Sequence, residues 1–206
     1  MHSAKHAVGV QVVIFGLAAC GLLTTPAGAQ APAGVPVFQI TPVESTIKFQ
    51  VAASVAIDGT FDQWEASLTF TSPAAESAVL DVKIQAASVN TGSGLKDRTL
   101  KGDDFFNVEQ DPSITFHSTQ VVQTGPETFD MPGTFTIRGV SKPETLHLTV
   151  SGKGTGSGEI TGTMAFDRKD FGMTHNILFL HIADRVEVSV RLKATRVSGP
   201  PVVLKQ

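Results

Sequence analysis

The sequence predicts an all-β protein of about eight antiparallel strands, arranged as a closed barrel or as a sandwich of two sheets. After residue 37, apolar and polar residues alternate with period two in eight short segments, while helical periodicity is nearly absent. Turn-forming pairs such as Ser72-Pro73 and Gly125-Pro126 fall between these segments. Each segment therefore has one apolar and one polar face, as is typical of antiparallel sheets, and closure into a barrel would remove exposed sheet edges.

The expected strands follow one another along the chain, each with apolar side chains at alternate positions. They span residues 47–51, 64–70, 80–84, 114–116, 135–137, 146–150, 160–166 and 186–192. Pro132-Gly133, Lys142-Pro143 and the Gly-rich run 151–158 are interpreted as turns or loops between them.

Two connections break the alternation. Residues 94–107 predict a short helix that ends near Gly102, and residues 167–183 predict a long loop that carries apolar side chains. Because long loops over a barrel mouth are usually functional or ordered by packing, we expect both connections to lie at the rim.

The N-terminus has the features of an export signal over residues 1–29. Lys5 is its positive charge, residues 7–23 are apolar with only Gln11 polar, and Ala27-Gly28-Ala29 fits the small-residue cleavage rule. An uncleaved transmembrane anchor is the alternative. Its length lies at the lower limit for a spanning helix, and its glycines weaken it as a helix. We expect a periplasmic protein, and lipid attachment at Cys20, after Leu-Ala-Ala, is the other processing route.

Composition excludes several functional classes. The net charge of −3 and pI near 6.0 exclude a broadly basic surface, so we expect no nucleic-acid partner. A single Cys excludes an intramolecular disulfide and a paired-cysteine zinc or redox site. The 13 Phe and the absence of Tyr predict that wherever the aromatic rings gather, the environment is apolar.

Catalytic and metal-binding motifs are not recognisable. There is no GxSxG motif, and residues 151–158 lack the spacing of a phosphate-binding loop. His175 and His181 lie six residues apart in the long loop, a spacing that matches no standard zinc pattern. We therefore expect no enzyme activity, metal or cofactor, and a hydrolase or metal enzyme that uses these two histidines is the alternative.

Each of the two connections carries a cluster of charged residues just before Phe residues, a pair in the first connection and a single Phe in the second. Arg98 and Lys101 precede Phe105-Phe106, and Arg168 and Asp170 precede Phe171. One interpretation is structural, with ion pairs that fix the connections to the rim. The other is a site for a polar head group above an apolar interior, since arginine suits a phosphate or quinone oxygen.

Seven segments, in order, match one known family. They are 38–49, Gly59-Thr60-Phe61, 87–107, 111–119, 133–143, 168–172 and 182–186. On these segments, residues 38–196 resemble the YceI-like family, the lipid- and polyisoprenoid-binding proteins of bacterial envelopes. Many members carry histidines at places that Glu44 and about Ala53 occupy here, so a head-group role for those histidines is absent.

The resemblance implies an extended eight-stranded antiparallel β-barrel, lipocalin-like, with the short helix and the long loop at its rim. It also implies non-catalytic binding of a long amphiphile, such as a polyisoprenoid, an isoprenoid quinone or a fatty-acid derivative, which enters no reaction and needs no cofactor. The expected head-group residues are Arg98, Lys101, Arg168 and Asp170. The lipid tail is expected among the inward-facing side chains Ile47, Phe49, Val51, Phe61, Leu68, Phe70, Leu80, Val82, Ile84, Ile114, Phe116, Phe135, Ile137, Phe166 and Val188.

Sequence alone does not separate cavity from packed core, because small barrels fill their interior with side chains. An envelope interaction module with a filled core and no ligand is therefore the alternative function. A homodimer is compatible with the sequence, and no membrane span is expected after removal of the signal. The expected organisation is a signal peptide 1–29, a flexible tether 30–37, a barrel domain 38–196 and a C-terminal tail 197–206.

Overall fold

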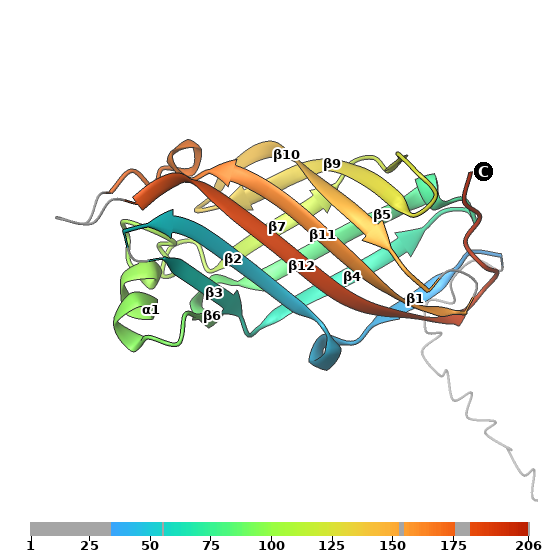
Figure 1. Cartoon of the computed structure of the whole chain (residues 1–206), viewed down its shortest axis with the longest axis horizontal. Helices are drawn as coiled ribbons and strands as arrows, with labels where there is room; N and C mark the ends of the chain where they lie inside the picture. The colour runs from blue at the N-terminus through green and yellow to red at the C-terminus, as the bar shows by residue number, and fades with distance from the viewer. Residues whose placement is uncertain (1–33, 55, 153–154, 176–181, 206) are drawn as a thin grey trace, which may run out of the picture. The chain divides into compact units, whose positions relative to one another are not determined.

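The computed structural model describes residues 34–54, 56–152, 155–175 and 182–205. The expected signal peptide with Cys20, the first half of the expected tether and His181 lie outside these residues. Within the described part, the strands form one curled antiparallel sheet in the order β4-β5-β7-β9-β10-β11-β12-β2-β3-β6, with β1 paired to β12 and β8 paired to β9 (Figure 1). The predicted all-β, antiparallel fold class is confirmed.

All eight expected strands are present, and the sheet contains four more: β1, β3, β6 and β8. The strands are β1 Val37–Ile40, β2 Thr46–Ala53, β3 Ile57–Phe61, β4 Trp64–Phe70, β5 Ala78–Gln85, β6 Val89–Asn90, β7 Ser113–Ser118, β8 Val122–Gln123, β9 Thr128–Ile137, β10 Val140–Val150, β11 Ser157–Asp167 and β12 Ile182–Ser198. β6 and β8 have two residues each, too few to show alternation. In β3 the inward position between Ile57 and Phe61 is Gly59, where a Cβ would lie 2.5 Å from Cε1 of Phe49. The glycine that makes room for this ring also hides the apolar pattern.

Two interpretations of turns are wrong. Pro132-Gly133 lies inside β9, and Lys142-Pro143 lies inside β10. Proline lacks an N–H donor, so it is tolerated in a strand where one neighbour has ended. The β7 ladder ends beside Pro132, whose carbonyl accepts a hydrogen bond from the Thr119 N–H at 2.9 Å. Pro143 pairs with β9, while β11 pairs with β10 only over residues 147–150.

The curl of the sheet depends on the long last strand. β12 has 17 residues. One of its edges pairs with β2 along the first part and with β1 along the last part, and its other edge pairs with β11. β1 also packs on β4, with the rings of Phe38 and Phe70 5.7 Å apart. The inner faces of these strands therefore surround a common apolar interior.

The predicted helix is confirmed as α1, Gly94–Lys101, with Gly102 at its C-terminal cap. The following Phe105 and Phe106 are buried, and Phe106 packs its ring 6.2 Å from that of Phe49. In the predicted long loop, the 3-10 helix η4 (Arg168–Phe171) follows β11. Three other 3-10 turns join the strands, η1 (Pro42–Glu44), η2 (Ala75–Ser77) and η3 (Ala86–Ser88).

The last part of the expected C-terminal tail lies on the sheet. Residues 200–205, here called the C-terminal segment, pair with the β4–β5 connection: the Val203 N–H donates to the Pro73 carbonyl at 2.8 Å, and the Ala75 N–H donates to the Val203 carbonyl at 3.0 Å. Figure 1 shows α1 at one end of the sheet and the C-terminus at the other. Among the described residues, no helix is long and apolar enough to cross a membrane.

Candidate functional site

The larger of two apolar cavities inside the curled sheet has a volume of about 350 Å³. This volume lies within the range of about 300–1,000 Å³ that is usual for small-molecule sites. Its walls come from strands β1, β4, β5, β9, β10, β11 and β12. They include Phe38, Leu68, Phe70, Leu80, Phe129, Met131, Leu148, Val150 and Ile160.

Polar groups gather along one side of the larger cavity. Within the described lining, its charged residues are Glu127 and Arg196. Ser151 lies in the Gly-rich connection of β10 to β11, and Ser157 is the first residue of β11. That connection is the hairpin loop that the sequence predicts over residues 151–158. Arg196 is half-buried and donates a hydrogen bond to the Gly199 carbonyl. The arrangement is amphiphilic: an apolar chamber with a cation, an anion and two hydroxyls at its edge.

The C-terminal segment covers part of the larger cavity. Val202 and Leu204 contribute to its wall, whereas the side chain of Val203 between them is 60% exposed. The segment is tied down by Gln123, which accepts from the Lys205 N–H at 2.7 Å and donates to the Lys205 carbonyl at 2.9 Å. The Lys205 ammonium also lies 2.9 Å from a carboxylate oxygen of Glu76, and this hydrogen bond lowers the pKa of Glu76.

The smaller cavity lies toward the α1 end and measures about 70 Å³. Phe105 and Phe106 line it together with Leu100 of α1, and Met173 and Arg168 line it from the connection after β11. Rings crowd this end of the interior: those of Phe61 and Phe106 lie 5.8 Å apart.

The structure distributes the 15 side chains that the sequence assigns to a lipid tail over three places. Ten line the smaller cavity: Ile47, Phe49, Val51, Phe61, Ile84, Ile114, Phe135, Ile137, Phe166 and Val188. Three line the larger cavity: Leu68, Phe70 and Leu80. Val82 and Phe116 are buried and line neither cavity. The role of all 15 in ligand binding stays a prediction.

Arg168 is 3% exposed, and its guanidinium donates to the protein itself. Nε donates to the Ala183 carbonyl at 3.1 Å, Nη1 to the carbonyls of Met173 and His175, and Nη2 to the Asp184 carboxylate at 3.1 Å. Arg168 thus joins both ends of the connection between β11 and β12. These contacts favour the structural interpretation of this charged cluster.

The other expected head-group residues lie outside the lining of both cavities. Arg98 and Asp170 are exposed, and Lys101 is half-buried. Their contact with a head group stays a prediction.

Of the two histidines of the alternative metal or hydrolase site, His175 lies within the described residues. His175 lies 3.4 Å from a carboxylate oxygen of Asp104 and is about half exposed. Among the described residues, no group of three or more potential metal ligands comes together.

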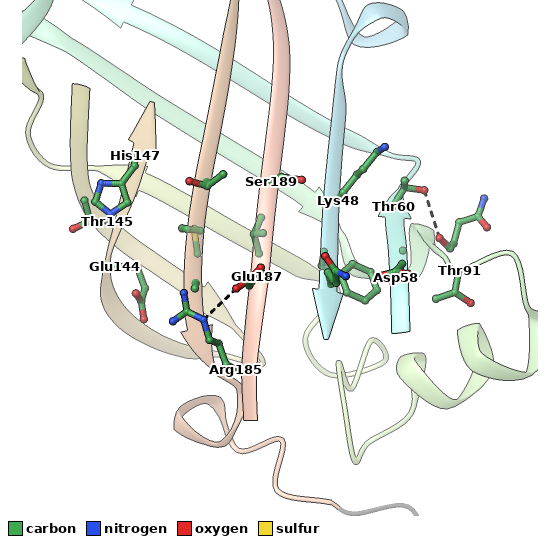
Figure 2. Close-up of a pocket in the computed structure, with 18 of the residues that line it drawn as sticks. Lys48, Asp58, Thr60, Thr91, Glu144, Thr145, His147, Arg185, Glu187 and Ser189 are labelled. Atoms are coloured by element: carbon green, nitrogen blue, oxygen red, sulfur yellow. Dashed lines mark hydrogen bonds and ion pairs between the residues drawn. The ribbon is translucent and has the colours of Figure 1, made fainter. Parts of the chain in front are cut away.

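A broad polar groove lies on the outer face of β10, β11, β12, β2 and β3, with a volume of about 1130 Å³ (Figure 2). Charged residues of both signs line it, and Arg185 and Glu187 form an ion pair at 3.3 Å. Burial, with a smaller contribution from Asp170, raises the pKa of Glu144 at the groove's edge. The groove consists mostly of the polar faces of the strands, which the alternation already places toward solvent.

The sequence-based prediction missed most of the lining of the larger cavity. Phe129 and Met131 alternate with Asp130 and carry the same signal as the expected strands, but Pro132-Gly133 was interpreted as a boundary after them. Val202 and Leu204 follow two prolines and carry no strand signal, so nothing in the sequence places them on a cavity.

Comparison with known proteins gives one family match and several relatives. The YceI-like domain matches residues 38–194. A UPF0312 protein of Pseudomonas savastanoi pv. phaseolicola is 31% identical over 122 residues, which cover 57% of this chain and 64% of that protein. A UPF0312 protein of Azotobacter vinelandii is 34% identical over 96 residues, which cover 47% of this chain and 50% of that protein. The matches thus span between half and two thirds of these curated relatives.

Three solved structures share the fold. The Campylobacter jejuni YceI protein is 30% identical with a TM-score of 0.58, covering 69% of this chain and 86% of that one. Burkholderia cenocepacia BcnA has a TM-score of 0.69 at 22% identity, covering 76% and 100%. A polyisoprenoid binding domain from Saccharophagus degradans has a TM-score of 0.63 at 17% identity, covering 78% and 99%. At these identities the last two are informative about the fold alone.

Proposed function

Because the chain belongs to the YceI-like domain family, we propose that it is a non-catalytic protein that binds a long amphiphilic lipid. The observation that supports this function most directly is the larger cavity of about 350 Å³, with apolar walls and polar groups along one side. A lipid places its chain among the aromatic and aliphatic side chains and its head group among the polar ones. A polyisoprenoid, an isoprenoid quinone and a fatty-acid derivative all have this form.

Burial of a hydrocarbon chain supplies enough free energy for such a function. Each methylene removed from water contributes about 0.8 kcal/mol, so ten contribute about 8 kcal/mol. That is about the free energy of a micromolar dissociation constant, before the entropic cost of association is subtracted. The Phe side chains of the wall carry no polar group, so a bound hydrocarbon chain leaves no hydrogen-bonding group there without a partner.

One solved structure that shares the fold carries a ligand in its description. The Saccharophagus degradans structure is described as a polyisoprenoid binding domain, and its fold covers 78% of this chain. Shared fold at 17% identity transfers no ligand by itself, so the ligand class depends on the apolar cavity together with family membership.

Export to the periplasm is a second part of the proposal, supported by the sequence of residues 1–29. Cleavage after Ala29 and lipid attachment at Cys20 are two routes to the envelope. Fractionation of cells tests export, and globomycin separates the routes: accumulation of a precursor supports attachment at Cys20, and normal processing supports cleavage after Ala29.

Lipid binding is tested by organic extraction of protein purified from its own organism, followed by mass spectrometry. The proposal expects an amphiphile with a long hydrocarbon chain at close to one molecule per chain. Extracts without a stoichiometric lipid would contradict it and favour the alternative of an envelope interaction module with a filled core.

A further inference from the structure

Two apolar cavities lie one after the other along the strands of the sheet. On β5 the inward-facing residues are Leu80, Val82 and Ile84: Leu80 lines the larger cavity, Ile84 lines the smaller one, and Val82 lies between. Leu80 and Ile84 are about 13 Å apart along the strand, at about 3.3 Å per residue. The distance between the two cavities is thus bridged by one layer of inward-facing side chains.

Phe116 is the largest side chain of this dividing layer on β5, β7 and β9. It is 6% exposed and stands directly opposite Val82 on one neighbouring strand and Phe135 on the other. On β7 the preceding inward residue, Ile114, lines the smaller cavity. The phenyl ring therefore lies where the interior passes from one cavity to the other.

The next inward-facing position on β9, diagonal to Phe116, is Gly133, and the ring of Phe116 occupies the space that a side chain there would take. Met131 lines the larger cavity, Phe135 lines the smaller one, and Gly133 lies between them. A Cβ on Gly133 would lie 2.7 Å from Cζ of Phe116. Removal of the ring would leave unfilled space over Gly133, because the glycine has no side chain to fill it.

We infer that Phe116 determines ligand chain length by closing the inner end of the larger cavity. This inference rests on the proposed function and deepens it. A chain that enters from the polar side, near Arg196, stops against the phenyl ring. The larger cavity alone then sets the number of carbons that leave water, and longer chains gain nothing from their additional carbons.

Replacement by a smaller side chain joins the two cavities. In Phe116→Ala a longer chain continues past Gly133 toward the smaller cavity. Each methylene that enters through the opened passage tightens binding about fourfold, which corresponds to about 0.8 kcal/mol. Phe116→Leu leaves a branched side chain and opens the passage less.

The test uses delipidated protein and a homologous series of unbranched fatty acids, with dissociation constants measured by calorimetry. In the wild type we expect affinity to rise with chain length and then to level off. In Phe116→Ala the plateau moves to longer acids, and in Phe116→Leu it moves in the same direction by less. Phe116→Leu also serves as the test if Phe116→Ala does not fold.

Phe171→Ala is the matched control. Phe171 is equally aromatic, is 0% exposed and lies outside the lining of both cavities. Its replacement removes a buried ring without opening the passage, so the plateau stays at the wild-type length. An unchanged plateau in both folded Phe116 variants, or an equal shift in Phe171→Ala, overturns the inference. Failure of the wild type to bind any acid and any long-chain prenol contradicts the proposed function itself.

Discussion

Replacement of Arg168 by methionine separates the two interpretations of the charged rim. The structure predicts that Arg168→Met destabilises the fold, because the buried guanidinium joins the carbonyls of Met173 and Ala183 to the carboxylate of Asp184. Methionine keeps the apolar stem and removes the donors. The carbonyls of Met173 and Ala183 lose this donor, whereas Asp184 keeps its ion pair with Lys169.

The expected loss is large for a single substitution. A buried acceptor that loses its donor costs about 1–3 kcal/mol, so the carbonyls of Met173 and Ala183 together cost about 2–6 kcal/mol. For a domain of this size, each kcal/mol lowers the midpoint of thermal unfolding by about 2–4 °C, so the midpoint should fall by roughly 4–24 °C.

Urea unfolding followed by circular dichroism measures the change, and Lys169→Ala is the control. Lys169 forms an ion pair with the same Asp184 at 2.7 Å but is about half exposed. Such exposed pairs contribute about 0–1 kcal/mol, so we expect little change. Wild-type stability in Arg168→Met combined with weakened lipid binding would refute the structural role and restore Arg168 to the head-group site.

Three further predictions concern the cavity wall, the head group and the helix. Val202→Asp places a carboxylate on the wall of the larger cavity and should weaken lipid binding at least tenfold in a titration. Val203→Asp, on the exposed side of the C-terminal segment, should leave lipid binding unchanged. Equal effects of the two substitutions would contradict the role of this segment. Arg196→Ala should weaken binding of an anionic lipid more than that of the corresponding neutral alcohol, and Arg98→Ala should affect neither; the opposite order would place the head group at the α1 end. The hydrogen bond from the Thr91 hydroxyl is the largest of the contacts that lower the pKa of Asp97 in the folded protein. The ionised Asp97 side chain therefore stabilises the fold above its unfolded-state pKa, and this stabilisation is lost as the pH falls through its folded-state pKa. Asp97→Asn should therefore lower the unfolding midpoint at neutral pH and match the wild type in strong acid, and a pH-independent difference would contradict this assignment.

The sheet was predictable because its strands are half-buried. Trp64–Phe70 and Ile160–Phe166 alternate cleanly because one face packs and the other meets water. Pro132-Gly133 misled because the local signal for a turn is strong, and the end of the β7 ladder that tolerates the proline is a tertiary fact.

The cavities were less predictable than the strands. Leu80, Val82 and Ile84 have the same pattern in the sequence, yet one lines the larger cavity, one the smaller and one neither. The difference arises on the neighbouring strands, where the ring of Phe116 pairs beside Val82 and fills the space over Gly133. Periodicity indicates which side chains face inward, whereas empty space depends on what faces them.

The C-terminal segment is a second case of this kind. Val202 and Leu204 reach the larger cavity because Val203 pairs with the distant β4–β5 connection. The prolines before them interrupt any strand pattern, so the sequence favours an irregular tail. Conversely, the charged residues near α1 predict a head-group site from the sequence, but they do not line the larger cavity.

The central claim is that the larger cavity holds a lipid chain, and a crystal structure of protein purified from its own organism without delipidation tests it most directly. We predict continuous elongated electron density between Leu148 and Phe70, with its polar end near Arg196 and its apolar end against Phe116. Density for a lipid in the outer groove, with the larger cavity filled by rearranged side chains, would contradict the account.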